Sequence, residues 1–293
     1  MAKSKEDSVF LDPSIQIARL VHGPQTKAGI RHRLAQHERV FTSLVVRQEF
    51  KRRLLKEAEY LLRLLHRFKS FDEVHQHVIR LFGPWPSTVR KRTICLQTLS
   101  QVHGGTDAER TDRLQLYLRS LLVTGLKQFD RKFGEVVKDA ACACACVDVV
   151  EKQPLRRYDL GPEHCSRTKP GACGIVQFLT SRKRNWQAIL TQLKSIPDAK
   201  KSTEIKNAER FLERLVESPN NASDDDPCLT VGDLVIALES VGIPIFYTLN
   251  SKESQHLCRA LDQTLIVRPI DPTKAEVNCL KDEPNWPSFG AER

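Results

Sequence analysis

The chain has 293 residues, 40% of them hydrophobic, which is enough to bury a sizeable core in one elaborated domain or in two small ones. The amino-terminal sequence MAKSKEDSVF lacks the pattern of a signal peptide, and no apolar run approaches the roughly 18 residues of a membrane helix. We therefore expect a soluble, cytoplasmic protein with no membrane partner. A formal net charge of +10 favours polyanionic partners, because Lys and Arg displace counterions from phosphates.

The first predicted elements are a strand, a helix and a second strand. An apolar run at residues 8–12 predicts a strand that ends in Asp12, and helical spacing after Pro13 predicts a helix that ends near Gly23. The β-branched and aromatic residues at 40–43 predict the next strand. We therefore expect Asp12 to lie where a strand turns into a helix.

Residues 44–68 have the apolar period of one long amphipathic helix, broken at most once, with Glu49 near its start. Basic residues crowd this helix and the segment before it: Arg31, Arg33, Arg39, Arg47, Lys51, Arg52, Arg53, Lys56, Arg63, Arg67 and Lys69. A basic face that binds nucleic acid and a merely solvated helix face are both consistent with this pattern.

The middle of the chain is predicted to be largely helical. Breaks at residues 83–86 and 104–107 separate the helices, and the last of them extends to about residue 129. Periodicity then fails between residues 140 and 172, where cysteines concentrate, so we expect an irregular loop there.

This loop carries a candidate zinc site. Three thiols at alternate positions share one face of an extended chain, and thiols and imidazole are typical ligands of structural Zn²⁺. The candidate ligands are Cys142, Cys144, Cys146, His164, Cys165 and Cys173. Small Cys and Ala residues also suit tight helix packing, so structural zinc and simple packing both stay open. If zinc is present, this segment and the central helices could form a zinc-stabilised interaction module.

Helices and strands alternate again in the last third of the chain. Helices are predicted at residues 186–193, 205–215 and 231–240 and from Ser251 onward, and strands at residues 243–248 and 264–267. Strands that alternate with helices predict an α/β fold with a mainly parallel central sheet.

Three carboxylates follow turns that would face the same edge of this sheet. Ligand sites in open α/β sheets form beyond the carboxyl ends of the strands, where Asp12 is expected, and Glu49 and Asp233 could converge on the same edge. A cluster of carboxylates is costly unless a hard cation neutralises it, and Mg²⁺ or Mn²⁺ prefers oxygen ligands. Each acid also has a structural interpretation: Asp12 as a turn or cap residue, Glu49 as a surface acid, and Asp233 as an acid favoured by a helix dipole.

The motifs around these acids resemble those of the PIN-domain family of nucleases. Residues 9–14 (VFLDPS) look like its first strand and aspartate, and residues 41–49 (FTSLVVRQE) like its second strand and the helix with the second acid. Residues 232–238 (GDLVIAL) and 242–248 (GIPIFYT) are similar to its third motif and the strand after it. The resemblance implies a three-layer PIN-like fold. Its core would combine residues 1–70 and 181–275, with a helical, Cys-containing insertion at 71–180 and a tail at 276–293.

The resemblance also implies an activity, which is Mg²⁺- or Mn²⁺-dependent hydrolysis of RNA by an endoribonuclease, of the toxin or defence type. Asp12, Glu49 and Asp233 would be the metal ligands and, with Asn250, the catalytic residues. Candidate contacts to nucleic acid are Ser14, Arg47, Lys51 and Arg52. The partners would be RNA and a protein such as an antitoxin.

One position departs from the family pattern. Asn250 stands where the family usually places a fourth aspartate, and an amide can coordinate a metal through its oxygen but adds no negative charge. The alternative function is therefore a catalytically weak or inactive PIN-like protein that binds RNA or a protein partner.

Overall fold

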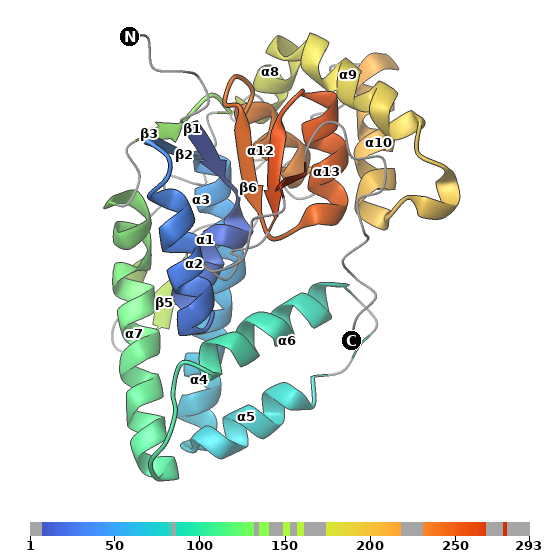
Figure 1. Ribbon diagram of the computed structural model, residues 1–293. Helices are drawn as coiled ribbons and strands as arrows, with labels where there is room; N and C mark the ends of the chain where they lie inside the picture. Colours follow the sequence, from blue (N-terminus) through green and yellow to red (C-terminus); the bar gives the residue numbers. More distant parts are fainter. Residues whose placement is uncertain are drawn as a thin grey trace.

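A computed structural model describes residues 8–81, 83, 86–131, 135–140, 149–152, 157–160, 174–217, 231–267 and 278–279. Its central sheet has the strand order β3-β2-β1-β6-β7-β8 (Figure 1). The strands are β1 (Ser8–Leu11), β2 (Arg39–Ser43), β3 (Glu135–Val137), β6 (Ile245–Thr248), β7 (Thr264–Val267) and β8 (Asn278–Cys279). The first five strands in this order are parallel, and β8 pairs antiparallel with β7. The predicted α/β fold with a mainly parallel sheet is confirmed.

Helices connect these strands. Two of them, α1 (Pro13–Val21) and α2 (Pro24–Leu34), join β1 to β2. The connection from β2 to β3 contains α3 (Leu44–Phe50), a π-helical turn (Lys51–Leu55), α4 (Lys56–Phe68), α5 (Phe71–Ile79), α6 (Pro86–Leu99) and α7 (Asp107–Arg131). The connection from β3 to β6 contains the antiparallel pair β4 (Val150–Lys152) and β5 (Arg157–Asp159), then α8 (Gly174–Ser181), α9 (Lys183–Lys194), a 3-10 turn (Asp198–Lys200), α10 (Thr203–Glu217) and α12 (Gly232–Glu239). The last helix, α13 (Ser251–Ala260), joins β6 to β7.

The core is centred on β1, whose apolar residues are fully buried. Phe10 lies opposite Phe41 of β2 and Phe246 of β6, and its ring stacks on that of Phe246 at 5.6 Å between centroids. Burial of such apolar surface is the main force that holds a sheet between its helices. The same hydrophobic cluster continues without a break into the helices between β2 and β3.

The long helix predicted for residues 44–68 is present and contains one irregularity. The Lys56 N–H donates to the Lys51 carbonyl, five residues earlier, which is the hydrogen bond of a π-helix. After this turn, α4 buries Leu61 and Leu65 and packs against α7, which forms a long helical arm with α4 in Figure 1. Two helical phases are therefore joined in one continuous element.

Some elements were not predicted from the sequence. Helix α2 was missed because it has almost no apolar period: only Gly29, Ile30 and Arg33 are buried. The sequence predicted a helix end near Gly23, but a proline there is also compatible with a helix start, and Pro24 occupies the first turn of α2. The helix predicted from Ser251 onward is α13, which begins at Ser251 and has Asn250 at its N-cap position.

The strand order reverses between β1 and β6. From β1 the chain proceeds outward to β2 and β3, and it then returns to β6 and proceeds outward in the opposite direction to β7. In open α/β sheets, the carboxyl ends of two such strands border a crevice that binds ligands.

Among the described helices, none is long and apolar enough to span a bilayer.

Candidate functional site

Asp12 lies at the carboxyl end of β1 and is almost completely buried, with 7% of its surface exposed. It is the N-cap of α1: its Oδ1 accepts hydrogen bonds from the Ser14 N–H at 2.9 Å and from the Ile15 N–H at 3.3 Å. The Ser14 hydroxyl donates to the same oxygen at 2.5 Å, and the Thr248 hydroxyl donates to Oδ2 at 2.7 Å. Both carboxylate oxygens are therefore held by neutral donors.

These contacts connect the ends of β1 and β6 at the reversal of strand order. The Ser14 hydroxyl accepts the Leu249 N–H at 2.7 Å, and the Thr248 hydroxyl accepts the Asn250 N–H at 2.9 Å. Burial raises the pKa of Asp12 above its ordinary value, and the hydrogen bonds from Ser14 and Thr248 oppose this effect. Ser14, predicted to contact nucleic acid, is used here inside the protein. Asn250 makes no side-chain cap on α13.

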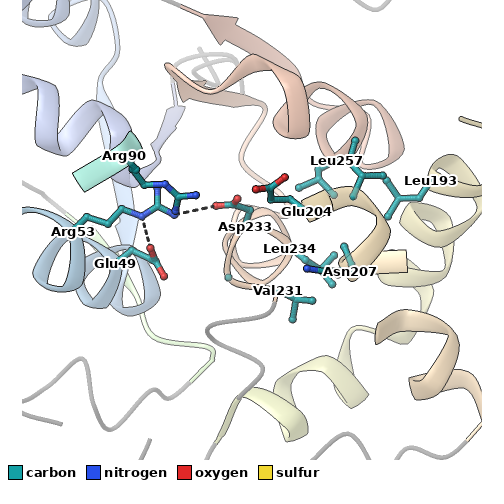
Figure 2. Close-up of a pocket in the computed structure, with 13 residues that line it drawn as sticks. Glu49, Arg53, Arg90, Leu193, Glu204, Asn207, Val231, Asp233, Leu234 and Leu257 are labelled. Carbon is teal, nitrogen blue, oxygen red and sulfur yellow. Dashed lines mark ion pairs between the residues drawn. The ribbon is translucent and has the colours of Figure 1, made fainter. Parts of the chain in front are cut away.

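Glu49 and Asp233 are joined by a residue that we did not predict, Arg53. Its Nε lies 2.6 Å from Glu49 Oε2, and its Nη2 lies 4.0 Å from Asp233 Oδ1 (Figure 2). Burial by itself would lower the pKa of Arg53, but the charges of Glu49, Asp233 and Asp12 raise it above its ordinary value. All three predicted acids therefore act on one guanidinium group.

Local structure explains this geometry. Glu49 and Arg53 are separated by four residues, so they lie on the same side of the helix that runs from α3 into the π-helical turn. Asp233 is in the first turn of α12, and the preceding Gly232 allows α12 to approach α3 closely. A Cβ added to Gly232 would lie 3.4 Å from Glu49 Oε1. A side chain at position 232 would press on the acidic site.

A pocket of about 390 Å³ opens beside this ion-pair cluster. Its lining residues are Glu49, Arg53, Arg90, Leu193, Glu204, Ile205, Asn207, Ala208, Val231, Gly232, Asp233, Leu234 and Leu257 (Figure 2). Its volume falls in the range of small-molecule sites. Asp12 does not line this pocket, so the three predicted acids divide into one inner residue and two that face the pocket.

The three basic residues predicted to bind nucleic acid lie mostly inside the protein. Arg47 forms a two-point ion pair with Asp130, with Nε–Oδ1 at 2.9 Å and Nη2–Oδ2 at 3.1 Å. Only 2% of the surface of Lys51 is exposed, and 14% of the Arg52 side chain, whose Nη1 lies 3.9 Å from Glu49 Oε1. This geometry does not support a direct contact between Arg47 or Lys51 and a nucleic-acid backbone.

Besides Arg53, a buried acid was not predicted from the sequence: Glu239, at the end of α12. Its Oε1 accepts the Ala140 N–H at 3.3 Å, and its side chain also bonds Ser43, the N-cap of α3. Burial raises the pKa of Glu239 to about 7. The signal for it in the sequence is weak, because it is only an acid at the end of a mostly apolar helix.

A hard divalent cation prefers oxygen donors. Carboxylate oxygens predominate, and Arg53 already supplies the positive charge that they share. Within the described ranges, no group of three or more His, Cys, Asp or Glu side chains has the geometry of a metal site. The predicted zinc ligands Cys142, Cys144, Cys146, His164, Cys165 and Cys173 lie outside the described residues.

Similarity to known proteins adds nothing to this geometry. Comparison of the chain with protein-family models, with curated proteins and with solved structures finds no match. The resemblance to PIN-domain nucleases therefore depends on the four sequence motifs alone.

Proposed function

We propose that the protein is a PIN-like nuclease that hydrolyses phosphodiester bonds of RNA with the help of Mg²⁺ or Mn²⁺. One observation carries the proposal: Glu49 and Asp233 come from opposite ends of the chain, yet both form ion pairs with Arg53, whose pKa the charge of Asp12 also raises. Three independent structural roles for these acids would not require them to converge.

The sheet supports the proposal. The acids gather where the strand order reverses between β1 and β6, which is the position of ligand sites in open α/β sheets. Because right-handed crossovers change face when the strand order reverses, helices are expected on both faces of such a sheet. Such an arrangement is compatible with the three-layer fold that the motifs imply.

Each residue of the site would have its own role in phosphodiester hydrolysis. Glu49, Asp233 and Asp12 would hold the cation, which lowers the pKa of a bound water and neutralises charge on the phosphate. Ser14 and Thr248 fix the carboxylate of Asp12 by donating hydrogen bonds to it. Arg53 and the exposed Arg90 line the pocket and can attract the phosphodiester backbone.

A second candidate function is RNA binding without cleavage. Its support is the short ion pair between Arg53 and Glu49, because a guanidinium group that neutralises the acids reduces their need for a metal ion. In this case the pocket would bind RNA through Arg90 and the basic surface of the protein alone.

Cleavage of a labelled single-stranded RNA by purified protein, with Mn²⁺, with Mg²⁺ or with EDTA, separates the two functions. The nuclease should cut only with metal, and Glu49→Gln and Asp233→Asn should each lower the rate by at least about 100-fold. Glu73→Gln, an exposed acid in the first turn of α5, is the matched control and should cut at the wild-type rate. RNA binding with no metal-dependent cleavage would contradict the nuclease and support the second candidate.

A further inference from the structure

We infer that the pocket beside the acidic cluster contains a subsite for one unstacked nucleobase that carries an exocyclic amino group. This inference rests on the proposed function, because it assumes that the cluster receives the RNA backbone. It assigns a role to the part of the pocket that the acidic site does not use.

The pocket has two chemically different walls. One wall is charged and contains Glu49, Arg53, Arg90 and Asp233, where a phosphodiester would lie. The other wall is apolar and contains Leu193, Ile205, Ala208, Leu234 and Leu257, from α9, α10, α12 and α13. An apolar wall cannot form hydrogen bonds with a phosphate, but it can pack against the flat face of a nucleobase that is transferred out of water.

Two polar side chains on α10 face the same space. Asn207 and Glu204 both line the pocket and are three residues apart, so they lie on one side of the helix. Neither side chain has a hydrogen-bond or ion-pair partner within the described part of the chain. Half-buried polar groups with no internal partner are available to a ligand.

These two groups can distinguish bases. The amide of Asn207 offers both a donor and an acceptor, whereas an ionised Glu204 only accepts. A carboxylate therefore favours cytosine, adenine or guanine, which present an amino group, over uracil, which presents carbonyl oxygens at the corresponding edge. Arg90, which also has no partner among the described residues, can hold the adjoining phosphate.

A substitution at Ala208 can test whether a nucleobase binds at the apolar wall of the pocket. Its small, half-buried side chain lies on the apolar wall, one residue after Asn207. A leucine at this position would extend into the pocket without weakening α10, because leucine is a strong helix former. The matched control is Gln187→Ala, an exposed amide on α9 that does not line the pocket.

The experiment measures equilibrium binding in EDTA, so cleavage plays no part. The probes are fluorescent RNA pentamers that are abasic at every position, or that carry a single cytosine or a single uracil at the centre. The cytosine probe should bind wild-type protein about tenfold more tightly than the abasic probe, and more tightly than the uracil probe. Ala208→Leu should remove the gain from the base, Glu204→Gln should equalise cytosine and uracil, and Gln187→Ala should change neither.

Equal affinity of the three probes would overturn the subsite. If Ala208→Leu loses its folded circular dichroism spectrum, Asn207→Ala replaces it and should reduce the preference for the cytosine probe. The two proposals fail separately: metal-dependent cleavage with no base preference leaves the nuclease without this subsite, and base-dependent binding with no cleavage leaves the subsite without the nuclease.

Discussion

The acidic cluster stabilises its carboxylates in two ways. Asp12 is buried and its oxygens are held by two backbone N–H groups and by the hydroxyls of Ser14 and Thr248. Glu49 and Asp233 instead share the guanidinium group of Arg53 at the edge of a pocket. Hydrogen bonds from the backbone stay in place as long as the protein is folded, whereas a side-chain cation can be exchanged for another cation. The fold therefore fixes the carboxylate of Asp12 in place, whereas Glu49 and Asp233 can exchange the guanidinium group of Arg53 for another cation.

The largest expected effect tests this division directly. Asp12→Ala removes the N-cap of α1 and leaves the buried hydroxyl of Thr248 without its acceptor, which should lower the free energy of unfolding by about 3 kcal/mol. Asp233→Ala removes a long ion pair at a helix start, with an expected loss below about 1 kcal/mol. Urea denaturation of both variants measures the difference, and equal losses would contradict the division.

Glu239 extends the comparison to a buried acid that has hydrogen bonds but, among the described residues, no cation that shifts its pKa. In the unfolded chain its carboxyl ionises near its ordinary pKa of 4.5, whereas in the folded protein the pKa is about 7. The stability gained from the neutral folded carboxyl is therefore complete below the unfolded pKa and is lost as the pH rises through about 7.

Glu239→Gln cannot ionise, so it should not show this loss. Between about pH 5 and about pH 8, the variant should gain roughly 2 to 3 kcal/mol of unfolding free energy relative to wild type. Denaturant titrations at the two pH values, with Glu73→Gln as the exposed control, provide the measurement. A constant difference between variant and wild type across this range would show that Glu239 does not titrate as described.

The last substitution, at Arg53, combines a moderate effect on stability with a specific effect on the response to metal. Arg53→Gln leaves Glu49 and Asp233 without their shared cation and should cost about 2 kcal/mol in EDTA, less than a fully buried pair because a quarter of the arginine side chain is exposed. Because the acids have lost this cation, Mn²⁺ should raise the melting temperature of Arg53→Gln more than that of wild type. Arg53→Lys keeps the charge and should respond like wild type, and an equal Mn²⁺ response of all three proteins would contradict an exchangeable cation.

The sequence was sufficient to predict the parallel sheet, Asp12 at the end of a strand, and Glu49 and Asp233 in helices, because apolar period and Gly or Pro punctuation are local signals. The role of Arg53 could not be predicted in the same way. Lys51, Arg52 and Arg53 are adjacent and equally basic, and the helical phase decides which of them faces the acids. That phase depends on the π-helical turn, which is fixed by tertiary packing and leaves no clear mark in composition.

The π-helical turn at Lys51–Leu55 also affects which substitutions the protein can tolerate during evolution. A π turn is equivalent to one residue inserted into an α-helix, and here the extra residue is absorbed between α3 and α4. Substitutions that retune the segment around Glu49 and Arg53 need not rotate the leucines of α4 away from α7. A deletion of one residue in this turn would remove that independence, and the acidic cluster and the helical arm could then no longer both keep their registers.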